Sequence, residues 1–257
     1  MQPFDIAQAF VEQCERGLKI EDLKAAFEQA LQSLGFKLYA CCSHVDPLNP
    51  PPGAVVLHSY PKEWVKYFSE VGHYSIDPVF RYANRTLLPF SWDSAAFRAS
   101  LTRIQREILL EAQAMGIEHG YTVPIHRPGA LPASCSVVPQ STTLDRPSYL
   151  AVCLMGAYFY EAVSAEAGDP GRNRLIRPRL TEREQQCLEL AAQGKSDWAV
   201  GRILGISERT VHNHIERAKA RLGVTTRVQA IVHALFDRQI AFGDVIQSEL
   251  QSNKRIP

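Results

Sequence analysis

The chain has 257 residues, of which 46% are hydrophobic and 21% are charged, and this composition excludes a disordered or fibrous protein. Lys and Arg number 28 and Asp and Glu number 27, so the formal charge of +1 excludes a strongly basic coat protein for nucleic acid. The length predicts one large domain or two smaller ones, with room for a buried core.

Cysteine usage and hydropathy indicate the compartment. The six cysteines form no Cys-x-x-Cys pair and have no His at metal-ligand spacing, so we expect buried thiols in a reducing compartment and no metal. The N-terminus lacks the basic and apolar segments of a secretory signal. The longest apolar-rich stretch, 149–160, is shorter than the roughly 20 residues that span a bilayer. We therefore predict a cytoplasmic protein that does not enter a membrane and needs no cofactor.

The N-terminal two-thirds of the chain mixes helical and strand patterns. In chain order, they predict helices over Phe4–Arg16 and Asp22–Leu34, strands over Phe36–Cys42 and Ala54–His58, helices over Trp64–Val71 and Leu101–Met115, strands over Tyr121–Ile125 and Ala133–Val138, and a helix over Pro147–Ala165. Helices around a small antiparallel sheet form an α/β/α sandwich, so the expected fold class is α+β.

The composition changes after Glu166, where a stretch rich in Arg, Gly and Pro predicts a linker over 167–179. Residues 1–171 hold 13 Lys and Arg against 18 Asp and Glu, a balance of −5. Residues 172–257 hold 15 against 9, a balance of +6. We therefore predict an acidic domain over 1–166 and a DNA-binding domain over 180–257, because the basic part is the one suited to a polyanion.

The C-terminal part shows capped helices in close succession. Thr181 and Glu184 have the spacing of a capping box, and Ser196 and Ser207 each precede a further helix. The helices are expected after Thr181, over Asp197–Leu204, from Ser207 to Leu222, and over Arg227–Asp237. Two short capped helices joined by a Gly-containing turn are typical of the helix-turn-helix, so we expect an all-α, four-helix domain that reads DNA.

The third of these helices has an apolar face and a polar face. Its N-cap and polar face supply the residues that we expect to contact DNA: Ser207, Arg209, Thr210, His212, Asn213, Glu216, Arg217 and Lys219. Asn pairs with adenine, Glu accepts from cytosine, and hydroxyls near a helix start meet phosphates. A solvated surface helix is the alternative, which the succession of caps in a basic domain makes less favoured.

The run LTEREQQCLELAAQGKSDWAVGRILGISERTVHNHIERAKARLGVTTRVQAIVHAL resembles the helix-turn-helix domain of LuxR/FixJ-type transcription regulators. The LT-x-RE opening, the GKS turn, the IS-xx-TV-xx-H core and the LGV segment occur in order. The chain departs where the family usually has Glu-Ile-Ala and this sequence has Ala199-Val200-Gly201. The resemblance implies a transcription regulator.

The segment over 60–93 contains two Trp, four Tyr and three Phe, which fits an aromatic small-molecule pocket, with plain hydrophobic core as the alternative. The spacing of Tyr60, Trp64, Asp77 and Trp92, and Ser134 within GYTVPIHRPGALPASCSV, resemble the acyl-homoserine-lactone-binding domain of LuxR-type quorum-sensing receptors. The resemblance implies a homodimer that binds an N-acyl homoserine lactone and then a pseudo-palindromic operator on double-stranded DNA.

The resemblance also implies roles for these side chains. Trp64 would donate to the lactone carbonyl, and Asp77 would accept from the amide N–H. Tyr60 and Ser134 would bond the amide carbonyl, and Trp92 would wall the lactone ring. Asp77 has a structural alternative, because Asp followed by Pro is a common helix start.

Phe68 stands where the family usually has Tyr, so one hydroxyl for the amide carbonyl is missing. We expect altered acyl preference or weaker binding of simple lactones, by about fivefold. A receptor for a non-lactone signal and a ligand-independent regulator are the alternatives left open.

An enzyme is disfavoured. His126 with Cys135 or Ser134 is an imaginable base and nucleophile, but no nucleophile elbow, phosphate loop or metal cluster accompanies them. We expect instead that ligand burial completes the core of the sensor and stabilises a dimer through the helix over Pro147–Ala165. The sequence leaves open the acyl chain, the promoters, and whether the regulator is an activator or a repressor.

Overall fold

The computed structural model describes residues 2–127, 130–141, 145–167 and 179–241. The pattern of contacts along the backbone divides the chain into two compact units, and the N-terminal unit ends at residue 172. Most of the expected linker, residues 168–178, lies outside the described residues, so the domain boundaries remain a prediction.

Five strands form the sheet of the N-terminal unit, in the order β2-β1-β5-β4-β3, and every neighbouring pair is antiparallel. They are β1 (Phe36–Ser43), β2 (Val56–His58), β3 (Phe90–Ser91), β4 (Tyr121–Ile125) and β5 (Ala133–Pro139). Four of the five fall where the sequence predicts strands. The two-residue β3 is too short for an alternation of side chains to reveal it.

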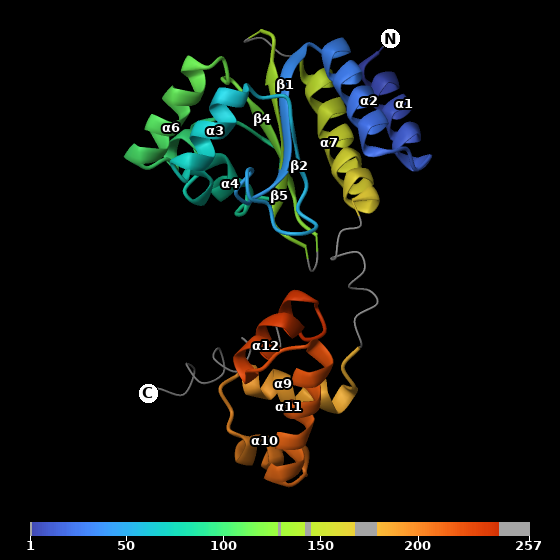
Figure 1. Cartoon of the computed structure of the whole chain (residues 1–257), viewed down its shortest axis with the longest axis vertical. Coiled ribbons are helices and arrows are strands. Elements are labelled where there is room, and N and C mark those ends of the chain that lie inside the picture. Colours follow the sequence, from blue (N-terminus) through green and yellow to red (C-terminus); the bar gives the residue numbers. More distant parts are fainter. Residues whose placement is uncertain (1, 128–129, 142–144, 168–178, 242–257) are drawn as a thin grey trace. The chain divides into compact units, whose positions relative to one another are not determined.

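Helices cover both faces of this sheet, which confirms the predicted α/β/α sandwich (Figure 1). One face carries α1 (Pro3–Glu15), α2 (Ile20–Ser33) and α7 (Arg146–Glu166). The other carries α3 (Lys62–Glu70), α4 (Pro78–Ala83) and α6 (Arg103–Ala114). The segment 73–99 also holds the short helices η1 (His73–Ser75) and α5 (Ala95–Ala99), which the sequence pattern does not predict.

The two faces of the sheet pack differently. Against α1, α2 and α7 lies a hydrophobic core in which the rings of Phe27 and Phe159 stack with their centroids 4.1 Å apart. Cys135 and Val137 of β5 belong to this core. Because successive side chains alternate across a strand, Ser134 and Ser136 point to the opposite face, where the second layer encloses a cavity.

The C-terminal unit consists of α9 (Glu182–Ala192), α10 (Asp197–Leu204), α11 (Glu208–Leu222) and α12 (Arg227–Phe236). The side chains of Thr181, Ser196 and Ser207 each accept a hydrogen bond from the backbone N–H three residues on, as predicted. Gly205 and Gly223 end α10 and α11 with φ of 68° and 69°, a conformation that glycine adopts without strain. The four-helix helix-turn-helix is therefore confirmed.

None of the described helices has the length and hydropathy needed to cross a membrane. All six cysteines are free thiols. Four are buried as expected, whereas Cys42 and Cys153 are partly exposed.

Gly120 precedes β4 where the backbone passes the indole of Trp92. The backbone N–H of Trp92 donates to the Gly120 carbonyl at 2.9 Å, and a Cβ at Gly120 would lie 2.6 Å from three ring carbons of Trp92. Gly120→Ala should therefore lower the free energy of unfolding by about 1–3 kcal/mol, because the buried ring must shift. Urea titration followed by tryptophan fluorescence measures this loss. Met115→Ala, at an exposed position five residues earlier, is the control and should change stability much less.

Candidate functional site

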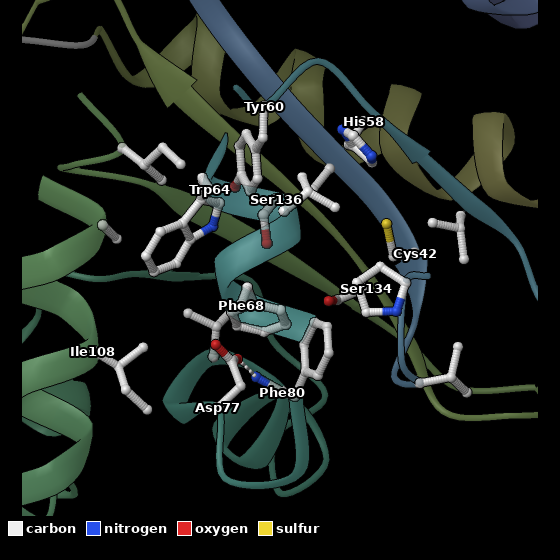
Figure 2. A pocket seen from close by; sticks show the side chains of 18 of the residues that line it. Cys42, His58, Tyr60, Trp64, Phe68, Asp77, Phe80, Ile108, Ser134 and Ser136 are labelled. Atoms are coloured by element: carbon white, nitrogen blue, oxygen red, sulfur yellow. Dashed lines mark hydrogen bonds between the residues drawn. The ribbon is translucent and has the colours of Figure 1, made fainter. Parts of the chain in front are cut away.

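A cavity lies between the sheet and helices α3, α4 and α6 (Figure 2). It holds about 810 Å³ of space free of protein atoms, its opening to solvent included. Its wall is mostly aromatic and aliphatic, which is usual for a small-molecule site. The residues predicted to bind a ligand all line it: Tyr60, Trp64, Phe68, Asp77, Trp92 and Ser134.

Asp77 is the N-cap of α4. Its Oδ1 accepts from the backbone N–H of Phe80 at 2.7 Å, drawn as a dashed line in Figure 2, and Pro78 occupies the first helical position. The structural alternative for Asp77 is thus present. The side chain is 8% exposed, and burial raises the pKa of the carboxyl group to about 7 although the N–H groups of Phe80 and Val79 oppose the shift. Asp77 therefore offers a buried acceptor that a donor inside the cavity would stabilise.

Trp64 and Tyr60 supply donors to the same cavity. Trp64 is 5% exposed, and its indole N–H has no hydrogen-bond partner among the described residues. Burial raises the pKa of Tyr60 well above its usual range, so its hydroxyl keeps its proton. Both side chains are amphipathic and present a ring and a donor together.

Phe68 adds to the aromatic wall, with its ring centroid 5.7 Å from that of Trp64 and 6.2 Å from that of Phe80. The adjacent Tyr67 does not line the cavity, because its hydroxyl donates to Oε1 of Glu111 at 3.1 Å. Tyr67 therefore does not replace the hydroxyl that Phe68 lacks.

The indole of Trp92 is hydrogen-bonded to a residue of the sheet. Its indole N–H donates to Oγ1 of Thr122 at 2.8 Å, and Oγ1 of Thr122 lies 2.9 Å from Oγ of Ser136. Thr122 is fully buried and Ser136 is 5% exposed. The ring of Trp92 can therefore wall a ligand, as predicted, but its N–H is already used.

Ser134 is hydrogen-bonded to His44, a residue that the sequence pattern does not point to. Its Oγ lies 2.9 Å from Nε2 of His44, whose Nδ1 lies 2.9 Å from Oδ1 of Asn84. The His44 ring stacks on Phe80, with centroids 4.2 Å apart and an interplanar angle of 12°. Burial lowers the pKa of His44 to about 4, so the ring is neutral near pH 7.

Four further polar residues of the sheet line the cavity and were missed: Cys42, Ser43, His58 and Ser136. The alternation of strand residues is the signal that finds Ser136, because it lies two positions after Ser134 on the same strand. His58 of β2 is paired with Ala40 of β1, which also lines the cavity, so its side chain lies on the same face of the sheet. Nδ1 of His58 is buried and has no hydrogen-bond partner among the described residues.

The polar face of α11 carries the predicted DNA contacts. Arg209, His212, Asn213 and Arg217 are exposed, whereas Thr210 is half-buried. Oγ of Ser207 lies 2.8 Å from Oγ1 of Thr210 and accepts from its backbone N–H. The two hydroxyls are thus positioned at the start of the helix, where free N–H groups favour a phosphate.

Two side-chain contacts change what α11 can offer. Nζ of Lys219 lies 2.8 and 2.9 Å from the two carboxylate oxygens of Glu216. Nδ1 of His212 lies 3.6 Å from Asp197, the first residue of α10, which also pairs with Arg227 of α12. Asp197 thus links three helices of the unit.

The chain matches two protein families. Residues 19–163 match the autoinducer binding domain, and this match alone covers more than half of the chain. Residues 178–234 match the bacterial regulatory proteins of the luxR family. The chain belongs to the LuxR family of autoinducer-binding transcription regulators. This membership confirms the resemblance seen in the sequence and the prediction of a regulator rather than an enzyme.

Named relatives agree with this assignment. VanR of Vibrio anguillarum, a transcriptional activator protein, is 30% identical over 221 residues, which cover 84% of this chain and 89% of VanR. BjaR1 of Bradyrhizobium diazoefficiens, also a transcriptional activator protein, is 28% identical over 223 residues, which cover 84% of this chain and 88% of BjaR1. The structure of Escherichia coli SdiA shares the fold, with a TM-score of 0.63 at 20% identity over 93% of this chain and 99% of SdiA.

The residues of the enzyme alternative do not meet. Ser134 faces the cavity while Cys135 packs in the opposite core, and Nε2 of His126 donates to the Thr86 carbonyl at 2.9 Å. Among the described residues, no group of three or more His, Cys, Asp or Glu could hold a metal ion.

The raised pKa of Asp77 predicts a pH-dependent stability. Its folded-state pKa of about 7 lies above its ordinary value, so the native state binds the proton more tightly than the unfolded chain does. Stability should therefore fall as pH rises from about 4 to about 7, by on the order of 4 kcal/mol from this group. Asp77→Asn keeps a capping side chain without the charge. The ligand-free variant should melt above the wild type at about pH 8 and at the same temperature near pH 4, as circular dichroism would measure.

Asp145→Asn is the matched control for this measurement. Asp145 caps α7 from an exposed position, and hydrogen bonds from Ser148 lower the pKa of its carboxyl group. Its replacement should not raise the melting temperature at about pH 8. An Asp77→Asn protein that melts no higher than the wild type at this pH would contradict the account of Asp77.

Proposed function

We propose that the chain is a receptor for an N-acyl homoserine lactone, dimerises when it binds this signal, and then binds a pseudo-palindromic operator. The observation that carries the proposal is the buried Asp77 carboxylate, which faces an apolar cavity together with the unpaired N–H of Trp64. A ligand with an amide N–H and a carbonyl a short distance apart satisfies both groups, and its acyl chain fits the apolar remainder of the wall.

The predicted contacts follow from this donor and acceptor set. Trp64 donates to the lactone carbonyl, Asp77 accepts from the amide N–H, and the Tyr60 hydroxyl donates to the amide carbonyl. Trp92 walls the lactone ring. When the ligand donates to Asp77, it favours the charged carboxylate, so binding removes part of the free energy that the empty site costs.

The recognition helix α11 is proposed to enter the major groove. Ser207 and Thr210 would contact a phosphate at the helix start, and Arg209 and Arg217 would contact phosphates or guanine. Asn213 is suited to adenine, and His212 and Glu216 lie on the same exposed face. Lys219 takes part through its pair with Glu216. The regulator would act in the cytoplasm, and the relatives VanR and BjaR1 support activation as its mode.

A gel shift tests ligand-dependent DNA binding. The purified full-length chain is mixed with a library of pseudo-palindromes of about 20 base pairs, with and without a long-chain acyl homoserine lactone. We expect a shift that requires the lactone, that is lost in Asp77→Asn, and that Arg217→Ala weakens by about tenfold. Arg183→Ala, which removes the same charge from an exposed site on α9, should leave the shift unchanged. No shift under any condition at low salt overturns the proposal, and an equal shift without lactone favours a ligand-independent regulator.

The dimer is proposed to form through α7. The outer side of this helix leaves Leu150 55% exposed and Tyr158 39% exposed, although the helix packs on the sheet along its other side. Leu150→Glu should convert the lactone-bound dimer to a monomer in sedimentation velocity, because it places a charge in an apolar contact. Ile104→Glu on α6, at a residue that is 58% exposed, should leave the dimer intact. A dimer that survives Leu150→Glu would exclude α7 as the interface.

A further inference from the structure

Two serines of β5 face the cavity, and each hydroxyl is held by a different set of neighbours. We propose that these neighbours give the serines opposite hydrogen-bonding roles, Ser136 donating to the ligand and Ser134 accepting from it, so that the pocket selects an acyl chain with a hydroxyl group β to the amide carbonyl over one with a keto group there. The inference rests on the proposed function, in which the ligand is an N-acyl homoserine lactone.

The role of Ser136 follows from the proton of Thr122. The indole N–H of Trp92 already donates to Oγ1 of Thr122, and Thr122 is fully buried. The acceptor within reach of the Thr122 hydroxyl among the described residues is Oγ of Ser136, at 2.9 Å. If Ser136 donated instead, the Thr122 proton would be a buried donor without a partner, which is costly. Thr122 therefore donates to Ser136, and the proton of Ser136 is left for the cavity.

The role of Ser134 follows from the tautomer of His44. Oδ1 of Asn84 accepts from Nδ1 of His44 at 2.9 Å, which places the ring proton on Nδ1. His44 is neutral near pH 7, so its Nε2 is an acceptor and the Ser134 hydroxyl donates to it at 2.9 Å. Stacking on Phe80 fixes the plane of the ring. Ser134 therefore presents oxygen lone pairs, and no proton, to the cavity, so it does not donate to the amide carbonyl as the family resemblance implies.

The register of the sheet places the two serines along the length of the ligand. Ser136 pairs with Ala40 of β1 and with Thr122 of β4, so it lies beside the Trp92 end of the cavity. Ser134 pairs with Cys42, which in turn pairs with Val56 of the edge strand β2, so it lies farther from Trp92 along β5.

In Figure 2, Ser136 lies between Trp64 and Ser134. The amide carbonyl therefore lies next to Ser136, and the start of the acyl chain passes Ser134. Ser136 thereby supplies the carbonyl donor that Phe68 lacks.

Binding of three lactones of equal chain length to the full-length protein tests this inference by calorimetry at about pH 8, where His44 is neutral. The three acyl chains are unsubstituted, β-hydroxy and β-keto. We expect the hydroxy form to bind about tenfold more tightly than the keto form, because a keto oxygen would face the lone pairs of Ser134. Equal dissociation constants, or tighter binding of the keto form, overturn the inference and leave the proposed function standing. Failure of all three to bind overturns the proposed function itself.

Variants separate hydrogen-bonding roles from structural ones, because the readout is the ratio of the two dissociation constants. Ser134→Ala should bring the ratio of hydroxy to keto binding close to one, whereas Ser136→Ala should weaken all three ligands by about fivefold and leave the ratio unchanged. His44 is a positioning residue. His44→Phe keeps the stacking and removes the acceptor, which frees the Ser134 proton and should move the ratio toward the keto form.

Asn84→Asp controls for the orientation of the Asn84 amide. A carboxylate only accepts, so it holds the proton on Nδ1 of His44 and should keep the preference for the hydroxy form. A preference that inverts in Asn84→Asp would show that the wild-type amide donates to His44, and it would overturn the inference. Thermal melts of each variant establish that it is folded.

Discussion

Strand β5 lies at the centre of the sheet with all seven of its residues buried, and the two layers of the N-terminal unit both depend on it. Alternation divides its side chains between a closed hydrophobic core and the wall of the cavity. The hydroxyl groups of β5, those of Ser134 and Ser136, lie on the cavity side of the strand. Each is hydrogen-bonded to a residue outside β5. A shift of register by one residue would exchange these surfaces, placing hydroxyls in the core beside Phe159 and thiol and methyl groups in the cavity.

The carboxylate of Asp77 has a structural role, as the N-cap of α4, and is also the acceptor of the proposed ligand contact. One oxygen caps α4 through the Phe80 N–H, so the group is fixed in place before a ligand arrives. This position removes the carboxylate from water, and the loss of solvation is the reason that the pKa of Asp77 is raised. The carboxylate is held in place but lacks a full set of hydrogen-bond donors. A ligand that donates to it in the folded state would therefore also stabilise the fold of the N-terminal unit.

Long periodic segments and capped helices could be predicted from the sequence because their signals are local. Thr181, Ser196 and Ser207 cap helices in the structure as the spacing indicates. The aromatic spacing also located the residues of the cavity wall, through family resemblance. His44 and Thr122 could not be found in this way, since their roles depend on hydrogen bonds to partners that are 90 and 14 positions away in sequence. Short elements such as β3 and α5 exist because of tertiary contacts and carry no period of their own.

The Glu216–Lys219 pair on α11 has a consequence for the thermodynamics of DNA binding. A cation that approaches a phosphate contributes to affinity mainly by releasing condensed counterions, and each such contact steepens the dependence on salt concentration. Lys219 already has a carboxylate on its ammonium group and a side chain that is 18% exposed, so it brings little counterion release. In the proposed complex with DNA, Lys219 would therefore add less to the salt dependence of binding than the basic balance of residues 172–257 suggests.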